Sequence, residues 1–155
     1  MFTVVMKYSL FKYSGNKKEI ESLDIYGSTI MIFPESDLVV VKSKAEFFNY
    51  TDVKPIIEGV YPFVGSRERI YDFFSDVREI TYFTVFGPKG TVIDLIESDE
   101  HSAAKHLIKA QYPIDEIHCI YKRKELHFKD GGKRVEVPED TDILSILQEY
   151  ANMVL

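Results

Sequence analysis

The chain contains a single cysteine, Cys119, and no tryptophan. One thiol cannot form a disulfide within the chain, and it cannot supply the several cysteine ligands of a structural zinc site. Cys119 lies in an apolar stretch, where a small packed thiol is the expected use. Chains without disulfides are typical of reducing compartments, so the sequence predicts a cytoplasmic protein.

Long apolar runs are also missing. No stretch approaches the about 20 residues that a membrane-spanning helix needs. Residues 1–7 lack the basic region and the continuous apolar core of a signal peptide. We therefore expect a soluble protein with no membrane partner. Because repeats and low-complexity tracts are absent as well, the 155 residues predict one domain, 1–155, with Gly59 to Gly65 as its candidate hinge.

Alternating apolar residues are plentiful, and they predict strands. Residues 2–10 follow the period of two that a half-buried strand requires, and Leu23, Ile25 and Gly27 resume it before the unbroken apolar run of residues 30–33. Residues 38–41 form a third β-rich segment, and the three together indicate an N-terminal antiparallel meander. Residues 80–86 and 91–96 are joined by a short Gly-Pro-Lys-Gly segment, so they predict a hairpin. Residues 114–121 form a further strand, which leads into a second hairpin.

Three stretches carry apolar residues at helical spacing. They begin after Ser66, after Ser98 and after Asp140 or Thr141, all residue types that cap helix N-termini. Together with the strands, they predict an α+β fold. We expect a mostly antiparallel sheet with about three amphipathic helices packed on one face.

Basic residues are the minority, 19 against 25 acidic ones, and the formal net charge is -6. Six of them nevertheless gather between Tyr121 and Val137, and these are Lys122, Arg123, Lys124, Lys129, Lys133 and Arg134. If Gly131 and Gly132 are the central residues of a primed turn, Lys129 faces Arg134, and the neighbouring apolar pairs share one face. Two like charges opposite each other are destabilising, and a bound phosphate would relieve them.

A local basic surface on an acidic protein favours an anionic partner. We therefore predict a small intracellular binding or regulatory protein that contacts nucleic acid or an acidic partner protein through the basic hairpin. Contacts to nucleic acid would go mostly to phosphates, because lysine and arginine here supply charge more than base recognition. The other interpretation is a solvated outer face, with edge-strand lysines that block sheet-to-sheet association.

The histidines predict no metal site, and no cofactor is expected. His101 and His106 are five residues apart, whereas two ligands on one helix face need a spacing of four. His118 and His127 lie on separate strands, so whether they meet depends on the fold.

An acidic cluster supplies the main alternative function. Asp94 interrupts the apolar strand 91–96, and Glu97, Asp99 and Glu100 follow it. Converging carboxylates would hold a divalent cation, so this alternative is a metal-dependent phosphodiesterase or nuclease. Asp94 and Glu97 face opposite sides of a regular strand, while the last two acids suit a helix N-terminus. The sequence therefore favours a binding protein over an enzyme, and a structural or assembly protein is the second alternative.

Overall fold

The computed structural model of the protein describes residues 5–15, 28–33, 37–44, 59–63, 67–75, 77, 79–86, 92–95, 114–138 and 141–154. Within these ranges the chain forms nine β-strands, two α-helices and one short 3-10 helix. In chain order the elements are β1 (Val5–Tyr13), β2 (Thr29–Ile32), β3 (Leu38–Ser43), β4 (Val60–Pro62), α3 (Arg67–Ser75), β5 (Glu79–Phe86), β6 (Val92–Leu95), β7 (Ile114–Tyr121), β8 (Lys124–Lys129), η3 (Asp130–Gly132), β9 (Arg134–Pro138) and α5 (Leu144–Val154).

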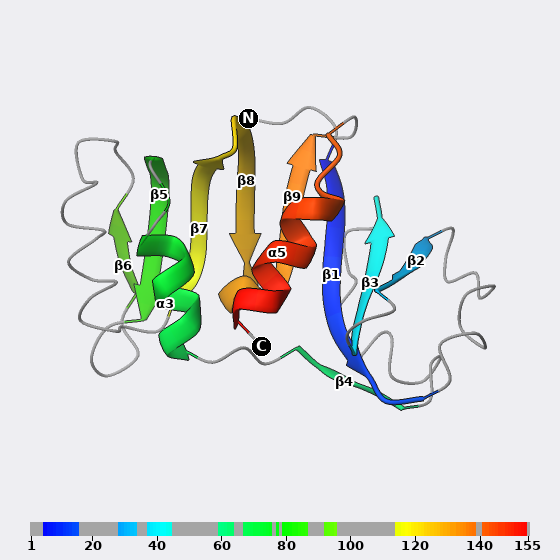
Figure 1. Ribbon diagram of the computed structural model, residues 1–155. Coiled ribbons are helices and arrows are strands. Elements are labelled where there is room, and N and C mark those ends of the chain that lie inside the picture. The colour runs from blue at the N-terminus through cyan, green and yellow to red at the C-terminus, as the bar shows by residue number, and fades with distance from the viewer. Residues whose placement is uncertain are drawn as a thin grey trace.

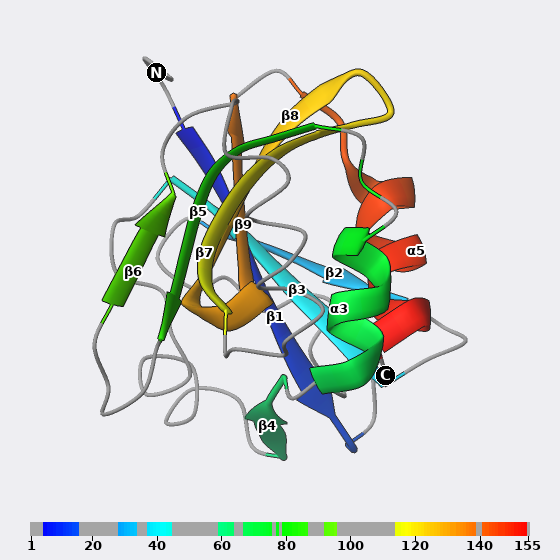
Figure 2. The ribbon, with the colours of Figure 1, turned by 90° about the vertical axis from the view of Figure 1, so that its left-hand side faces the viewer.

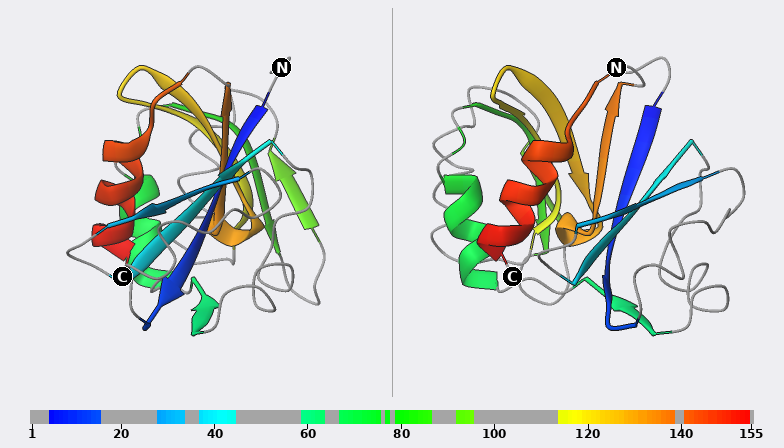
Figure 3. Two further views of the ribbon diagram at one scale, coloured as in Figure 1. Left: turned by 90° about the vertical axis from the view of Figure 1, so that its right-hand side faces the viewer. Right: turned by 45° about the vertical axis from the view of Figure 1, so that its right-hand side comes forward.

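All of the described strands belong to one sheet, in the order β2-β3-β1-β9-β8-β7-β5-β6, with β4 also paired to β1 (Figure 1). Every pairing is antiparallel. The sheet is strongly twisted, so β2 and β3 cross the view obliquely where β9 stands nearly upright (Figure 3). The predicted hairpin of residues 80–86 and 91–96 is confirmed by β5 and β6.

The predicted N-terminal meander is wrong, because β1 does not pair with the strand that follows it. One edge of β1 pairs with β3, and β2 lies beyond β3. The other edge pairs with β9 over Val5 to Ser9 and with β4 over Phe11 to Tyr13. The first described strand, β1, is therefore paired with the last, β9, and local periodicity does not encode such a long-range pairing.

The prediction of about three helices packed on the sheet is also wrong. The described residues form mostly antiparallel sheet with only two α-helices. The helix after Ser66 is confirmed as α3, and the last predicted helix is confirmed as α5. Asp142, rather than Asp140 or Thr141, accepts the N–H of Leu144 at 3.1 Å. The helix predicted after Ser98 lies outside the described residues.

The two described helices lie on the same face of the sheet (Figure 2). That face carries the larger apolar cluster, which includes the thiol of Cys119. The other face of β1, β2, β3 and β4 has an apolar cluster of its own, formed by Phe11, Tyr13, Ile30, Val39, Val41 and Val60. The first strands are thus buried on both sides, which explains why Leu38 to Val41 is an unbroken apolar run.

Aromatic rings join both helices to strand β8. The rings of Phe74 in α3 and Phe128 in β8 lie 5.0 Å apart and nearly perpendicular. Tyr150 in α5 lies 5.0 Å from Phe128 and 5.0 Å from Phe73 in α3. Edge-to-face contacts of this kind add about 0.5–1.5 kcal/mol each to area burial, so β8 has a firmly packed inner face.

Candidate functional site

The hairpin of β8 and β9 has the predicted register. Lys129 lies opposite Arg134, Phe128 opposite Val135, and His127 opposite Glu136. Gly131 and Gly132 have φ angles of 68° and 91°, and the Lys133 N–H donates to the Asp130 carbonyl at 3.4 Å. Positive φ angles at both glycines agree with a turn centred on them. Asp130 also has a positive φ of 54°, and Lys133 is in the right-handed helical region, so the connection from Asp130 to Lys133 is longer than the predicted two-residue loop. The inner face of the hairpin is fully buried, and its side chains are Leu126, Phe128, Val135 and Val137.

The six basic residues do not form one surface. Lys122, Arg123 and Lys124 lie at the turn between β7 and β8, whereas Lys129, Lys133 and Arg134 lie at the turn between β8 and β9. These two turns are at opposite ends of β8 (Figure 1). Because β8 has six residues, about 3.3 Å apart along the strand, the two groups are separated by roughly 17 Å.

The first group partly serves to attach helix α5. The ammonium group of Lys122 lies 2.6 Å from Glu149, and the hydroxyl of Tyr121 donates to the same carboxylate at 2.8 Å. These two hydrogen bonds hold the pKa of Glu149 below its usual range. Lys124 donates to the main-chain carbonyl of Asp142. Arg123 is exposed and has a φ of 68°.

The second group contains an internal counter-charge. The carboxylate of Glu136, a residue only 6% exposed, lies 3.2 Å from the Lys129 ammonium and 3.3 Å from Nε of Arg134. Arg134 also reaches Asp130 at 3.5 Å. The repulsion expected between Lys129 and Arg134 is thus offset by Glu136, and no bound phosphate is needed to relieve it. Lys133 is exposed at the turn itself.

A polar face lies on the side of β1, β5, β7, β8 and β9 opposite the described helices. Strand register places its side chains in two adjacent rows across the sheet. The first row is Tyr82, His118, His127, Glu136 and Lys7, and the second is Thr84, Glu116, Lys129, Arg134 and Ser9. A β-bulge between Ile80 and Tyr82 makes this possible, because the extra residue lets Ile80 face the core and Tyr82 face outward.

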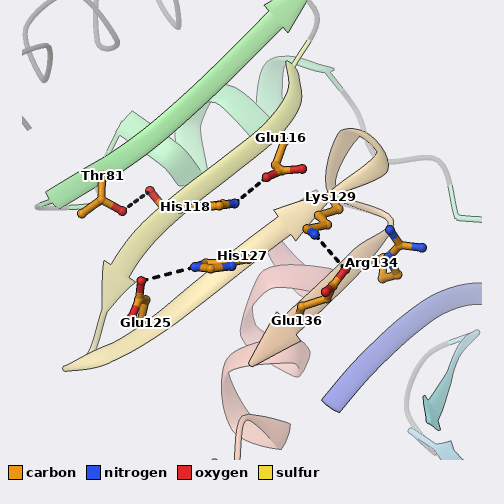
Figure 4. Close-up of polar contacts among 8 residues, drawn as sticks. All are labelled: Thr81, Glu116, His118, Glu125, His127, Lys129, Arg134 and Glu136. Atoms are coloured by element: carbon orange, nitrogen blue, oxygen red, sulfur yellow. Dashed lines mark hydrogen bonds and ion pairs between the residues drawn. The ribbon is translucent and has the colours of Figure 1, made fainter. Parts of the chain in front are cut away.

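Two stacked histidines occupy the centre of this polar face (Figure 4). The rings of His118 and His127 lie 3.5 Å apart and within 8° of parallel. Tyr82 covers the other side of His118, with ring centroids 4.7 Å apart. Each histidine is bound through Nε2 to a glutamate two residues earlier on its own strand, His118 to Glu116 at 2.5 Å and His127 to Glu125 at 3.3 Å.

Burial lowers the pKa of both histidines. Desolvation is the main cause for His127, and its glutamate partner opposes the shift. For His118, the neighbouring His127 ring lowers the pKa further. The two side chains are 20% and 14% exposed, so they are partly accessible from outside. Both rings are therefore neutral near pH 7.

Sequence reasoning left the meeting of His118 and His127 undecided, although the signal was present. Two residues, Lys122 and Arg123, separate the strands β7 and β8. A two-residue turn places Tyr121 opposite Lys124, and the same register brings His118 opposite His127.

The acidic cluster is only partly described. Asp94 lies on β6 opposite Thr84 of β5, but nothing is described of its side chain, and Glu97, Asp99 and Glu100 lie outside the described residues. His101 and His106 lie outside them too. Among the described residues, no three histidine, cysteine or acidic side chains are arranged to hold a metal ion. The nuclease alternative therefore stays a prediction.

In the part of the chain that the structure describes, no helix combines the length and the apolar character needed to cross a membrane. A comparison of the chain with protein-family models, curated proteins and solved structures found no match.

Proposed function

We propose that the protein binds nucleic acid through the hairpin of β8 and β9, together with the turns at the two ends of β8. The observation that carries this proposal is an excess of positive charge on a firmly held element. Between Tyr121 and Pro138 the chain has six basic and three acidic residues, whereas its net charge is -6. The positions of the charges on a protein, more than its net charge, direct an anionic polymer to a particular part of its surface.

Rigid support favours this use of the hairpin. Its inner face packs on Phe74 and Tyr150, and its outer strand pairs with β1. Basic side chains held at fixed positions lose less conformational entropy on binding than side chains on a loose loop. The hairpin therefore presents its charges in a defined geometry.

The most available cations lie at the two turns. Arg123 and Lys133 are exposed, and neither contacts a carboxylate within the described residues. The separation of the turns corresponds to about five base-pair steps of rise along the axis of B-form DNA. We expect one strand of nucleic acid to touch both turns, with contacts mainly to phosphates and little dependence on base sequence.

Binding of labelled single-stranded and duplex oligonucleotides, measured by fluorescence anisotropy over a range of salt concentrations, tests the proposal. The informative variant is Arg123→Gln with Lys133→Gln. Losing two phosphate contacts should reduce the slope of log affinity against log salt by about 1.8 for duplex and about 1.4 for single strands. The matched control is Lys12→Gln with Arg69→Gln, which removes the same charge from β1 and α3.

Two results would contradict the proposal in different ways. If the Arg123 and Lys133 variant keeps the full salt dependence, the turns are only a solvated surface. If the wild-type protein binds neither oligonucleotide at low salt, the partner is not nucleic acid, and acidic proteins become the ligands to test.

A further inference from the structure

The polar face carries equal numbers of carboxylates and cations around two neutral histidines. Counted over the two rows and Glu125, it has three carboxylates and three cations, which are Glu116, Glu125, Glu136, Lys7, Lys129 and Arg134. With neutral rings the face has no net charge, so it adds nothing to the attraction of a polyanion. Each proton taken up by the histidines makes it more positive by one charge.

Groups from four strands bear on the stacked rings. Tyr82 of β5 covers His118, and Glu116 of β7 and Glu125 of β8 accept from the two rings. Lys129 of β8 raises the cost of a charge on both rings. Glu136 of β9 lies opposite His127, and its carboxylate is already shared by two cations. The rings therefore sit between acceptors that favour a proton and one cation, Lys129, that opposes it.

An anion bound on this face would shift that balance. A phosphate near Lys129 and Arg134 offsets the Lys129 charge that opposes protonation, so phosphate and proton must strengthen each other's binding. The Arg134 side chain is 20% exposed, so its guanidinium group can contact such a ligand, although its Nε is buried 3.3 Å from the Glu136 carboxylate. The face-to-face contact of 3.5 Å limits the pair to about one proton, since a second would lie directly against the first.

We propose that His118 and His127 form a proton-coupled part of the nucleic-acid site, where a backbone phosphate binds beside Lys129 and Arg134 as the stacked pair takes up a proton. This inference rests on the proposed function, and it adds regulation by pH to it. Affinity for a nucleic-acid strand then rises as the pH falls below the neutral range. Protons in this range act through histidine, because no other side chain has an ordinary pKa there.

Anisotropy titrations with labelled oligothymidylate between about pH 7.5 and about pH 5.5, at constant ionic strength, test the inference. Thymine has no group that titrates in this range, so any change comes from the protein. Uptake of one proton should lower the dissociation constant by up to about tenfold per pH unit. We expect the variant His118→Gln with His127→Gln to bind with little dependence on pH, and His101→Gln with His106→Gln to behave as the wild type.

A second measurement does not depend on the variants being folded. Imidazole signals of the wild-type protein, followed by NMR, should titrate at higher pH for His118 and His127 when oligothymidylate is added. Binding that is independent of pH, or a pH dependence that survives in the His118 and His127 variant, would overturn the inference and leave the proposed function standing. Absence of binding at every pH and at low salt would remove both.

Discussion

The hydroxyl of Tyr150 donates a 2.9 Å hydrogen bond to the carbonyl of Gly132, and this bond joins the last helix to the turn of the basic hairpin. Tyr150 is fully buried, and burial raises the pKa of its hydroxyl above the usual range. The contact also explains the glycine. Gly132 has a φ of 91°, and a Cβ at that position would overlap the Tyr150 hydroxyl. The position of the turn is thus fixed by a residue from α5.

The first prediction follows from this bond. Tyr150→Phe leaves the Gly132 carbonyl buried without its partner, so the free energy of unfolding should fall by about 1–3 kcal/mol. Urea denaturation followed by circular dichroism measures the change. Tyr61→Phe is the matched control, because Tyr61 is 53% exposed and should tolerate the loss of its hydroxyl. Equal stability of the two variants would contradict the role given to the Tyr150 hydroxyl.

The second prediction concerns the counter-charge inside the hairpin. Glu136→Gln removes the carboxylate that Lys129 and Arg134 share, so two cations are left facing each other. We expect the free energy of unfolding to fall by about 1–3 kcal/mol, less than for a fully buried pair because both cations are partly exposed. Urea denaturation at low and high salt measures the loss, which should shrink at high salt. An unchanged midpoint of unfolding would show that the Glu136 carboxylate does not stabilise the hairpin of β8 and β9.

This network also bears on the design of binding variants. Replacing Lys129, Lys133 and Arg134 together with alanine would leave Glu136 buried without a cation. A weaker affinity of that triple variant could then reflect lost stability rather than lost phosphate contacts. The pair Arg123 and Lys133 avoids this difficulty, since neither residue is needed to balance a buried carboxylate.

The third prediction is a dependence of stability on pH. The pKa of both His118 and His127 is lowered in the folded protein. The unfolded chain therefore binds protons more readily, and stability falls as the pH drops below the ordinary histidine pKa of about 6.5. Stability continues to fall until the pH is below the lowered pKa values of the two histidines in the folded protein. Thermal unfolding between about pH 7.5 and about pH 5 measures it.

Glutamine at both positions provides the comparison for this prediction. His118→Gln with His127→Gln should flatten the pH dependence of the melting temperature in this range, while His101→Gln with His106→Gln should leave it as in the wild type. A wild-type melting temperature that is constant across the range would contradict the lowered pKa values.

The fourth prediction separates binding from cleavage. Labelled single-stranded and duplex oligonucleotides are incubated with the protein and Mg²⁺ or Mn²⁺, with and without chelator. We expect retention of intact nucleic acid, as the proposed binding function requires. Chelator-sensitive cleavage that Asp94→Ala abolishes would instead establish the nuclease alternative.

Local sequence features predicted local structure well. The register of β8 and β9 was predicted from Gly131 and Gly132, because a turn centred on them leaves only one pairing that puts Phe128 and Val135 on the same face, although the connection itself is longer than two residues. The helix after Ser66 followed from its cap and apolar spacing. The division of the basic residues into two groups was missed, since closeness in sequence says little about closeness along an extended strand.

The sequence by itself determined which segments alternate, where the chain turns and which side chains carry charge, because these depend on neighbours a few residues apart. Only the tertiary structure decided that β1 pairs with β9, that Glu136 lies between Lys129 and Arg134, and that Tyr82 covers His118. Each of these contacts joins separate strands, and its energy exists only once the strands are aligned. For that reason the balanced polar face and its two stacked histidines are properties of the folded sheet.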